Sequence, residues 1–167
     1  MGGFTGDKVK NHAPKCWFPL THIESVQKHS NINLLSICDL DENQLNKAAA
    51  KYCIKNKYVD YHKMLTDLKP DLLCVATRTN VKTQIIKDVY NYGIRLIHVE
   101  KPICNSLKEL SEIEHLFNKD LRCTFGAIRR HFQVYKKAKE LVASNEFGQL
   151  RQIHTNMGRG GILWAHP

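Results

Sequence analysis

The sequence predicts an α/β protein built on a parallel sheet, and three observations support this fold class. Short apolar runs alternate along the chain with longer segments whose apolar residues recur at helical spacing. The runs are continuously apolar, as in strands that are buried on both faces. Polar residues that can bind ligands follow directly where several of these runs end. Together these features predict a doubly wound parallel sheet with helices on both faces.

The first predicted strand covers residues 33–38, Asn-Leu-Leu-Ser-Ile-Cys. Asp41 then serves as the N-cap of a helix, because its carboxylate can accept backbone N–H groups of the first turn. The apolar face of this helix recurs at helical spacing and consists of Leu45, Ala48, Ala49 and Tyr52.

The middle of the chain repeats this strand–helix pattern twice. Residues 71–76 form the next predicted buried strand, and Asn80 is the predicted cap of the helix that follows. Gly93 ends that helix in the position where glycine is usual. Residues 95–99 form a third strand, and Ser-x-x-Glu at 106–109 is a capping box ahead of another helix.

The last part of the chain changes its pattern. Residues 121–125 form a short strand, followed by a helix that ends near Gly148. Residues 149–157 alternate apolar and polar side chains, which suits an antiparallel sheet with one buried face. We therefore predict a first domain over residues 1–132, and over 133–167 a connecting helix and the first strand of an antiparallel α+β domain.

Composition fits a soluble globular protein, with 43% hydrophobic and 25% charged residues. No apolar run is long enough to span a membrane, and the N-terminus lacks the pattern of a secretory signal. The six cysteines lie far apart and form no C-x-x-C pair that would indicate zinc or redox chemistry. We expect a cytoplasmic protein without a metal site.

The net charge of +9 raises the question of an anionic partner. A basic surface attracts nucleic acid, an anionic membrane or the pyrophosphate of a dinucleotide alike. The lysines are scattered over predicted helices, and no motif that reads nucleic acid accompanies them. The sequence therefore disfavours a nucleic-acid partner.

Glu100-Lys101-Pro102 follows directly on the strand at 95–99, and open α/β sheets bind their ligands beyond the carboxyl ends of strands. For three residues alone, a solvated Glu-Lys pair before a turn is the alternative. However, residues 70–110 resemble the cofactor domain of the Gfo/Idh/MocA (glucose-fructose oxidoreductase / inositol dehydrogenase) family. There the same triad follows a strand–Thr–helix–Gly–strand unit, and its lysine serves in catalysis. The resemblance runs from about Gly3 to the last residue.

The resemblance implies a Rossmann-type sheet and an NAD(P)-dependent oxidoreductase. Such an enzyme transfers hydride between a nicotinamide cofactor and a hydroxyl or keto group of a sugar, cyclitol or nucleotide sugar. Lys101 is the implied catalytic residue and would hydrogen-bond the reacting hydroxyl, while Glu100 and Pro102 would adjoin the cofactor. The resemblance also implies a homo-oligomer for the full-length protein.

Two features bear on the adenosine half of the cofactor. Gly3 and Gly6 match the second and third glycines of the fingerprint G-x-G-x-x-G, with Met1 where the first would stand. Asp39 directly follows the first predicted strand, where a carboxylate can accept both ribose hydroxyls, although a turn or cap is its alternative role. Leu40 offers no charge to a 2′-phosphate, so the sequence favours NAD over NADP.

The loop after the strand at 71–76 contains Thr77, Arg78 and Asn80, and in the family this loop runs beneath the nicotinamide. Thr77 matches the family threonine. Arg78 replaces a common proline, and Lys82 stands where histidine is frequent. The resemblance implies that these loop residues contact the cofactor.

Arg130 matches a family stretch that lines the substrate pocket, and His166 lies just before the position of a family histidine. The family's first strand has no counterpart here, and the second domain has only begun at residue 167. We therefore expect a fragment that by itself binds NAD poorly and is inactive. Two alternatives remain open: a non-catalytic nucleotide-binding or partner module, and, from charge alone, a nucleic-acid binder.

Overall fold

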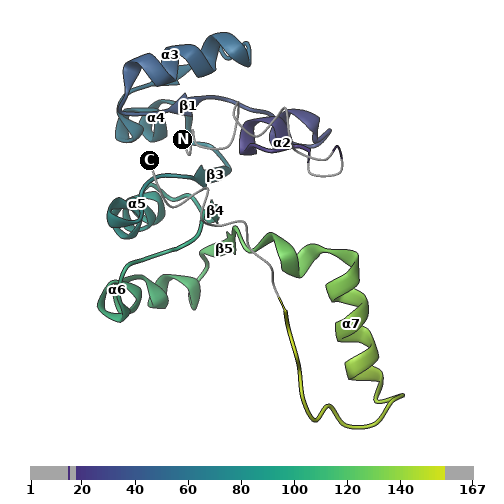
Figure 1. The fold of residues 1–167 in the computed structure, drawn as a ribbon. Coiled ribbons are helices and arrows are strands. Elements are labelled where there is room, and N and C mark those ends of the chain that lie inside the picture. The colour runs from purple at the N-terminus through teal and green to yellow at the C-terminus, as the bar shows by residue number, and fades with distance from the viewer. Residues whose placement is uncertain (1–14, 16–17, 157–167) are drawn as a thin grey trace. The chain divides into compact units, whose positions relative to one another are not determined.

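The computed structural model describes residue 15 and residues 18–156 (Figure 1). The chain divides into two compact units between Gly126 and Ala127, so the predicted boundary after residue 132 lies inside the second unit and stays a prediction. The first unit alternates helices and strands in the order α2 (His22–Lys28), β1 (Ile37–Cys38), α3 (Glu42–Lys51), β2 (Lys57–Tyr58), α4 (Tyr61–Leu68), β3 (Leu72–Val75), α5 (Thr79–Asn91), β4 (Leu96–Val99), α6 (Leu107–Phe117) and β5 (Arg122–Phe125).

Parallel pairing joins these strands into two sheets. In the smaller sheet β1 pairs with β2, and Ile37 lies opposite Lys57. In the larger sheet β4 lies between β3 and β5, with Val75 opposite Val99 and Val99 opposite Phe125. The predicted α/β class with parallel strands is confirmed. No strand within residues 18–156 pairs with both sheets.

Helices α5 and α6 cover one face of the larger sheet (Figure 1). Their buried apolar side chains form one core with alternate residues of the strands, including Val75, Ile97 and Val99. The residues that point the other way are more open, since Leu72 is 36% and Leu96 43% exposed. Cys74, which the sequence placed inside a buried strand, lies on this second face and is exposed.

The strand predicted over residues 33–38 is shorter than expected, because only Ile37 and Cys38 join a ladder. Their partner β2 is equally short, and the pairing ends with the bond from the Asp39 N–H to the carbonyl of Tyr58 (3.1 Å). A backbone segment without a partner strand cannot extend a sheet. Leu35 is 46% exposed, so the prediction that this segment is buried on both faces is wrong.

Several predicted helix ends are confirmed by their hydrogen bonds. The Asp41 carboxylate accepts two backbone N–H groups in the first turn of α3. At α6, the Ser106 hydroxyl accepts the N–H of Glu109 (3.2 Å), and the Glu109 carboxylate accepts the N–H of Asn105 (2.7 Å). Gly93 follows α5 with φ +84°, a left-handed conformation that glycine adopts without steric cost.

The prediction that Asn80 caps α5 is wrong. The helix begins at Thr79, and the extended residue before it is Arg78 (φ −65°, ψ 153°), whose side chain makes no capping bond. A cap needs extended backbone directly before the first turn. Asn80 already lies inside that turn, where its side chain is exposed.

The second unit contains the 3₁₀ helix η2 (Ile128–His131) and helix α7 (Gln133–Ser144). The strand predicted over residues 149–157 is not formed at 149–156, and Met157 lies outside the described residues. The described part of this unit contains no other strand with which such a segment could pair. An isolated strand leaves its backbone groups without partners, which explains the difference.

Two observations bear on the environment that the sequence predicted. Within the described residues the cysteines at 38, 53, 74, 104 and 123 are all free. None of the described helices combines the length and the apolar character that crossing a bilayer requires, and the longest of them, α5, has 13 residues.

The cap of α6 leads to a first prediction. Replacing Ser106 by Ala removes the acceptor for the Glu109 N–H and should lower the free energy of unfolding by about 1 kcal/mol. Ser111→Ala is the matched control, because that exposed hydroxyl only donates to the carbonyl of Lys108 within the same helix. Urea denaturation followed by circular dichroism measures both changes, and equal losses in the two variants would contradict the capping role.

Candidate functional site

The candidate site lies where the strands of the larger sheet end. Because β3, β4 and β5 are parallel, their carboxyl ends meet at one edge. Backbone bonds extend the ladder past β4 and β5, from the Glu100 N–H to the Val75 carbonyl (2.9 Å) and from the Gly126 N–H to the Val99 carbonyl (3.0 Å). The segments that follow these strands are thereby held side by side.

Glu100 is the residue on which these segments converge. Its carboxylate accepts the backbone N–H of Lys101 (3.2 Å) and is hydrogen-bonded to Nε2 of His22 (3.0 Å). A Cβ atom added to Gly126 would lie 2.5 Å from Glu100 Oε2 and 2.8 Å from its Cδ. Position 126 is therefore a glycine that leaves room for this carboxylate.

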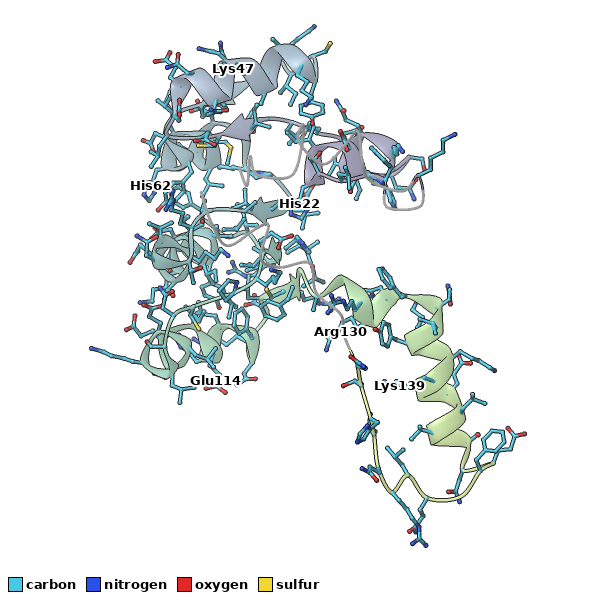
Figure 2. All side chains as sticks on the ribbon, in the orientation of Figure 1. His22, Lys47, His62, Glu114, Arg130 and Lys139 are labelled. Atoms are coloured by element: carbon cyan, nitrogen blue, oxygen red, sulfur yellow. The ribbon has the colours of Figure 1, made fainter. Side chains whose placement is uncertain are left out.

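Two histidines that the sequence did not predict as site residues lie beside Glu100. His22 is the first residue of α2, whose N-cap Thr21 accepts the N–H of Glu24, and Figure 2 shows it between α2 and the larger sheet. Its ring packs edge-on against His98 of β4, with centroids 5.0 Å apart, and His98 Nδ1 is hydrogen-bonded to the Thr124 hydroxyl (2.8 Å). No local pattern marks His22, because 78 positions separate it from Glu100.

Burial lowers the pKa of His98. The neighbouring His22 lowers this pKa further, and Glu100 raises it. The net lowering favours the neutral form of His98, which holds one N–H donor and one acceptor nitrogen.

Lys82 of α5 lies beneath the same loop and is only 1% exposed. Its ammonium donates to the carbonyl of Glu100 (2.5 Å) and to the carbonyl of Pro102 (2.8 Å). Burial lowers the pKa of Lys82 below that of an ordinary lysine, Glu100 raises it and Lys101 lowers it. In the sequence Lys82 stands out only as a departure from a family pattern, because lysines normally lie at the surface.

The predicted catalytic residue Lys101 is exposed at the end of β4, and the peptide bond that joins it to Pro102 is cis. Thr77 and Arg78 are exposed in the segment that follows the neighbouring strand β3. The Thr77 hydroxyl donates to the carbonyl of Arg78 at 3.4 Å, a long bond. The topology therefore brings five of the predicted cofactor residues to one sheet edge, namely Thr77, Arg78, Glu100, Lys101 and Pro102.

Asp39 lies at the carboxyl end of β1, in the smaller sheet. Its Oδ1 accepts the N–H of Asp41 (3.0 Å), so it helps to form the turn that leads into α3. This bond agrees with the turn role that the sequence left open for Asp39. Both oxygens of its carboxylate lie at the carboxyl end of β1.

Apart from Asp39, and from Asn80 in the first turn of α5, the other predicted site residues lie outside the described part of the first unit. Gly3, Gly6 and His166 lie outside the described residues. Arg130 belongs to η2 in the second unit, where its side chain is exposed (Figure 2).

Among the described residues, one group could hold a metal ion, formed by His22, His98 and Glu100, whose ligand atoms lie within 4.8 Å of one another. Hydrogen bonds already account for this arrangement. His22 and Glu100 bind each other, and His98 binds Thr124. The three residues therefore form a polar network around the Glu100 carboxylate.

Comparison with known proteins agrees with this geometry. Residues 17–127 match the family model described as "Oxidoreductase family, NAD-binding Rossmann fold", the Gfo/Idh/MocA family. The chain belongs to this oxidoreductase family. The match ends one residue beyond Gly126 and so contains every strand of the two sheets.

Curated proteins similar to this chain include inositol dehydrogenases. The inositol 2-dehydrogenase of Salmonella typhimurium is 22% identical over 128 residues, which cover 75% of this chain and 38% of that protein. The myo-inositol 2-dehydrogenase of Thermotoga maritima is 25% identical over 129 residues, which cover 77% of this chain and 38% of that protein. The chain thus spans less than half the length of these relatives.

Solved structures show the same fold. A scyllo-inositol dehydrogenase from Lactobacillus casei with bound NAD(H) and scyllo-inositol superposes with a TM-score of 0.69 at 20% identity, covering 76% of this chain and 38% of the other. An oxidoreductase from Agrobacterium radiobacter in complex with NAD+, L-tartaric acid and magnesium gives a TM-score of 0.69 at 17% identity, covering 76% and 37%.

The side chains at the strand ends fit a nicotinamide dinucleotide. Ribose hydroxyls need acceptors, and the carboxylates of Asp39 and Glu100 each stand at the carboxyl end of a parallel strand. Lys101 adds an exposed cation beside Glu100.

The close approach of Gly126 to Glu100 leads to a second prediction. Gly126→Ala should displace the Glu100 carboxylate, because the new methyl group would meet its oxygens at 2.5 and 2.9 Å. The contact is with the end of a flexible side chain, so the fold should survive while the bond to His22 is lost. NMR chemical shifts of the His22 ring and the Lys101 amide measure this change.

A double-mutant cycle supplies the control for that experiment. In a Glu100→Ala background, Gly126→Ala should have almost no further effect on the His22 and Lys101 signals, because nothing remains for the methyl group to displace. Unchanged signals in the single Gly126→Ala variant would contradict the prediction.

Proposed function

We propose that this chain supplies the cofactor site and the catalytic lysine of an oxidoreductase. The enzyme transfers hydride between NAD and a hydroxyl or keto group of a sugar, a cyclitol or a nucleotide sugar. The observation that carries the proposal is the position of Lys101. It is exposed at the end of the central strand of a parallel sheet, and its backbone is held on both sides by Lys82.

The proposed chemistry divides between the protein and the cofactor. When bound, NAD supplies the hydride acceptor or donor. Lys101 hydrogen-bonds the reacting hydroxyl oxygen and, in its neutral form, takes the hydroxyl proton during oxidation. It returns this proton to the oxygen during reduction. Glu100 holds the Lys101 backbone N–H and binds the ribose next to the nicotinamide. Pro102, Thr77, Arg78 and Asn80 complete the wall around the nicotinamide.

The substrate class is proposed from the relatives. Two of them are inositol dehydrogenases by name, and a solved structure similar to this chain is that of the WlbA dehydrogenase from Bordetella pertussis in complex with NADH and UDP-GlcNAcA. All three names point to polyhydroxylated rings. We assign substrate contact to Arg130 and His166, because a cation and an imidazole can hydrogen-bond hydroxyl and carboxylate groups.

The setting of the enzyme is also part of the proposal. Free cysteines at all five described positions support a reducing compartment, the cytoplasm. We propose a homo-oligomer for the full-length enzyme, as the family resemblance implies.

Cofactor choice gives a third prediction. In a chain that carries the relatives' full length, Asp39→Ala should raise the Kd for NAD on the order of tenfold and that for NADP much less. Only NAD offers a free 2′-hydroxyl to this carboxylate. Isothermal titration measures both constants.

Asp41→Ala is the control for the Asp39 experiment. Asp41 caps α3 and should lower thermal stability without separating the two cofactors. Equal losses of NAD and NADP affinity in Asp39→Ala would show that Asp39 serves only the turn before α3.

The catalytic role of Lys101 gives a fourth prediction. In the same full-length background, Lys101→Ala should reduce kcat by about 10²–10⁴-fold, because the proton at the reacting hydroxyl loses its acceptor. NAD affinity should stay within about twofold, since the Lys101 side chain acts at the substrate. Oxidation of a panel of cyclitols, followed by NADH absorbance, measures the loss. Lys108→Ala, which removes an exposed lysine from α6, is the control.

The outcome also separates this proposal from its main alternative. Binding of NAD without turnover of any polyol in the unmodified full-length chain would favour a non-catalytic nucleotide-binding module. Full turnover in Lys101→Ala would overturn the assignment of the catalytic residue.

A further inference from the structure

Lys82 is the largest fully buried side chain in the described part of the chain, at 1% exposure. A buried ammonium is costly, because the charge loses its hydration, and proteins normally keep lysine at the surface. Its neighbours on α5 are the core residues Ile85 and Ile86 and the buried Thr83. A methionine or leucine would fill such a position without this cost, so the charged end of Lys82 must have a use.

The contacts of Lys82 indicate that use. Its Nζ donates to two backbone carbonyls and to no carboxylate in the described residues, with distances of 2.5 Å to Glu100 and 2.8 Å to Pro102. These two carbonyls belong to the residues immediately before and immediately after Lys101 in the chain. The two bonds therefore fix the backbone from which the Lys101 side chain projects.

On the Pro102 side the loop has few other hydrogen bonds, and its next residue, Ile103, is held by packing against the core. Glu100 is held by the β3 ladder, by His22 and by its own bond to the Lys101 N–H. Pro102 has no N–H to donate, and within the described structure its carbonyl accepts one hydrogen bond, from Lys82. Loss of Lys82 would release the second half of the loop while the first half stayed in place.

We propose that Lys82 is the positioning residue for Lys101, holding the loop on both sides of it so that the Lys101 amine points at the reacting hydroxyl. Lys82 itself lies out of solvent and touches no substrate. The inference rests on the proposed function for its effect on turnover, but its effect on the loop can be measured without any activity.

The test compares three substitutions at one position. Lys82→Met keeps the length and the apolar stem but removes all donors. Lys82→Gln is shorter and neutral and retains two N–H donors. Lys82→Arg restores the N–H donors and the charge in a bulkier group.

Lys87→Met is the matched control. It removes another lysine of α5, one that binds the Glu112 carboxylate at the surface. Ile86→Val is a second control, which loosens the same core without touching the loop.

The first readout is amide hydrogen exchange of the peptide that covers residues 99–105, measured by mass spectrometry. Lys82→Met should speed exchange there at least tenfold, while peptides from β3 and α6 change no more than in Ile86→Val. Lys82→Gln should recover part of the protection. Exchange that rises equally in every peptide, or stays unchanged at 99–105, would overturn the proposal.

The second readout is the split between kcat and KM in a chain of the relatives' full length. Lys82→Met should lower kcat on the order of 10²-fold with little change in the KM for NAD, because a small misplacement of the reacting group slows chemistry more than binding. Lys82→Gln or Lys82→Arg should restore part of kcat. A loss confined to KM, or no rescue by either variant, would overturn the positioning role.

These readouts distinguish failure of this inference from failure of the proposed function. If Lys101→Ala keeps full turnover, the proposed function fails, yet the exchange result still decides whether Lys82 holds the loop. If Lys82→Met does not fold, competitive acetylation of the unmodified chain supplies the test. Lys82 should then react far more slowly than Lys87 and Lys101, and equal reactivity of the three lysines would overturn the buried contact.

Discussion

The central position of β4 is the constraint on which the rest of the site depends. Pairing on both edges places Val99 opposite Val75 and Phe125. The same ladder continues one step further, to the N–H groups of Glu100 and Gly126. Since main-chain hydrogen bonds set this register, the residues after β4 lie at a fixed point between their neighbours. A slip of one residue would turn Glu100 to the other face of the sheet, and Lys101 likewise.

The loop after β4 is also where distant parts of the first unit meet. His22 reaches it from α2, Lys82 from α5, and Gly126 makes space for it at the end of β5. The three residues act in different ways. His22 binds the Glu100 carboxylate, Lys82 binds two backbone carbonyls, and Gly126 leaves free the volume that the carboxylate occupies. A short loop without regular structure thereby acquires a defined conformation, which a catalytic group requires.

The sequence predicted the features that depend on local pattern. The capping box at Ser106, the glycine after α5 and the placement of Lys101 at a strand end all follow from spacing and residue type. The sequence could not predict contacts between distant segments, such as the bond between His22 and Glu100. Lys82 was missed because a lysine in a helix normally extends into water. Only the tertiary structure shows that two backbone carbonyls take the place of water around its ammonium. Strand β1 is shorter than the sequence predicted, because the length of a strand depends on its pairing partner and the partner β2 is equally short.

The two sheets share no strand in the described part of the chain, so packed side chains and the segment between β2 and β3 connect them. Helix α4 makes much of this connection. Its Met64 and Leu65 belong to the core of the larger sheet, and its Tyr61 hydroxyl donates to Asp88 of α5 (2.7 Å). Cys38 and Tyr58 of the smaller sheet pack against the same core. The cooperativity of unfolding between the two halves therefore rests on α4, and fraying of this one short helix would let the smaller sheet open while the larger sheet and its loop stay folded.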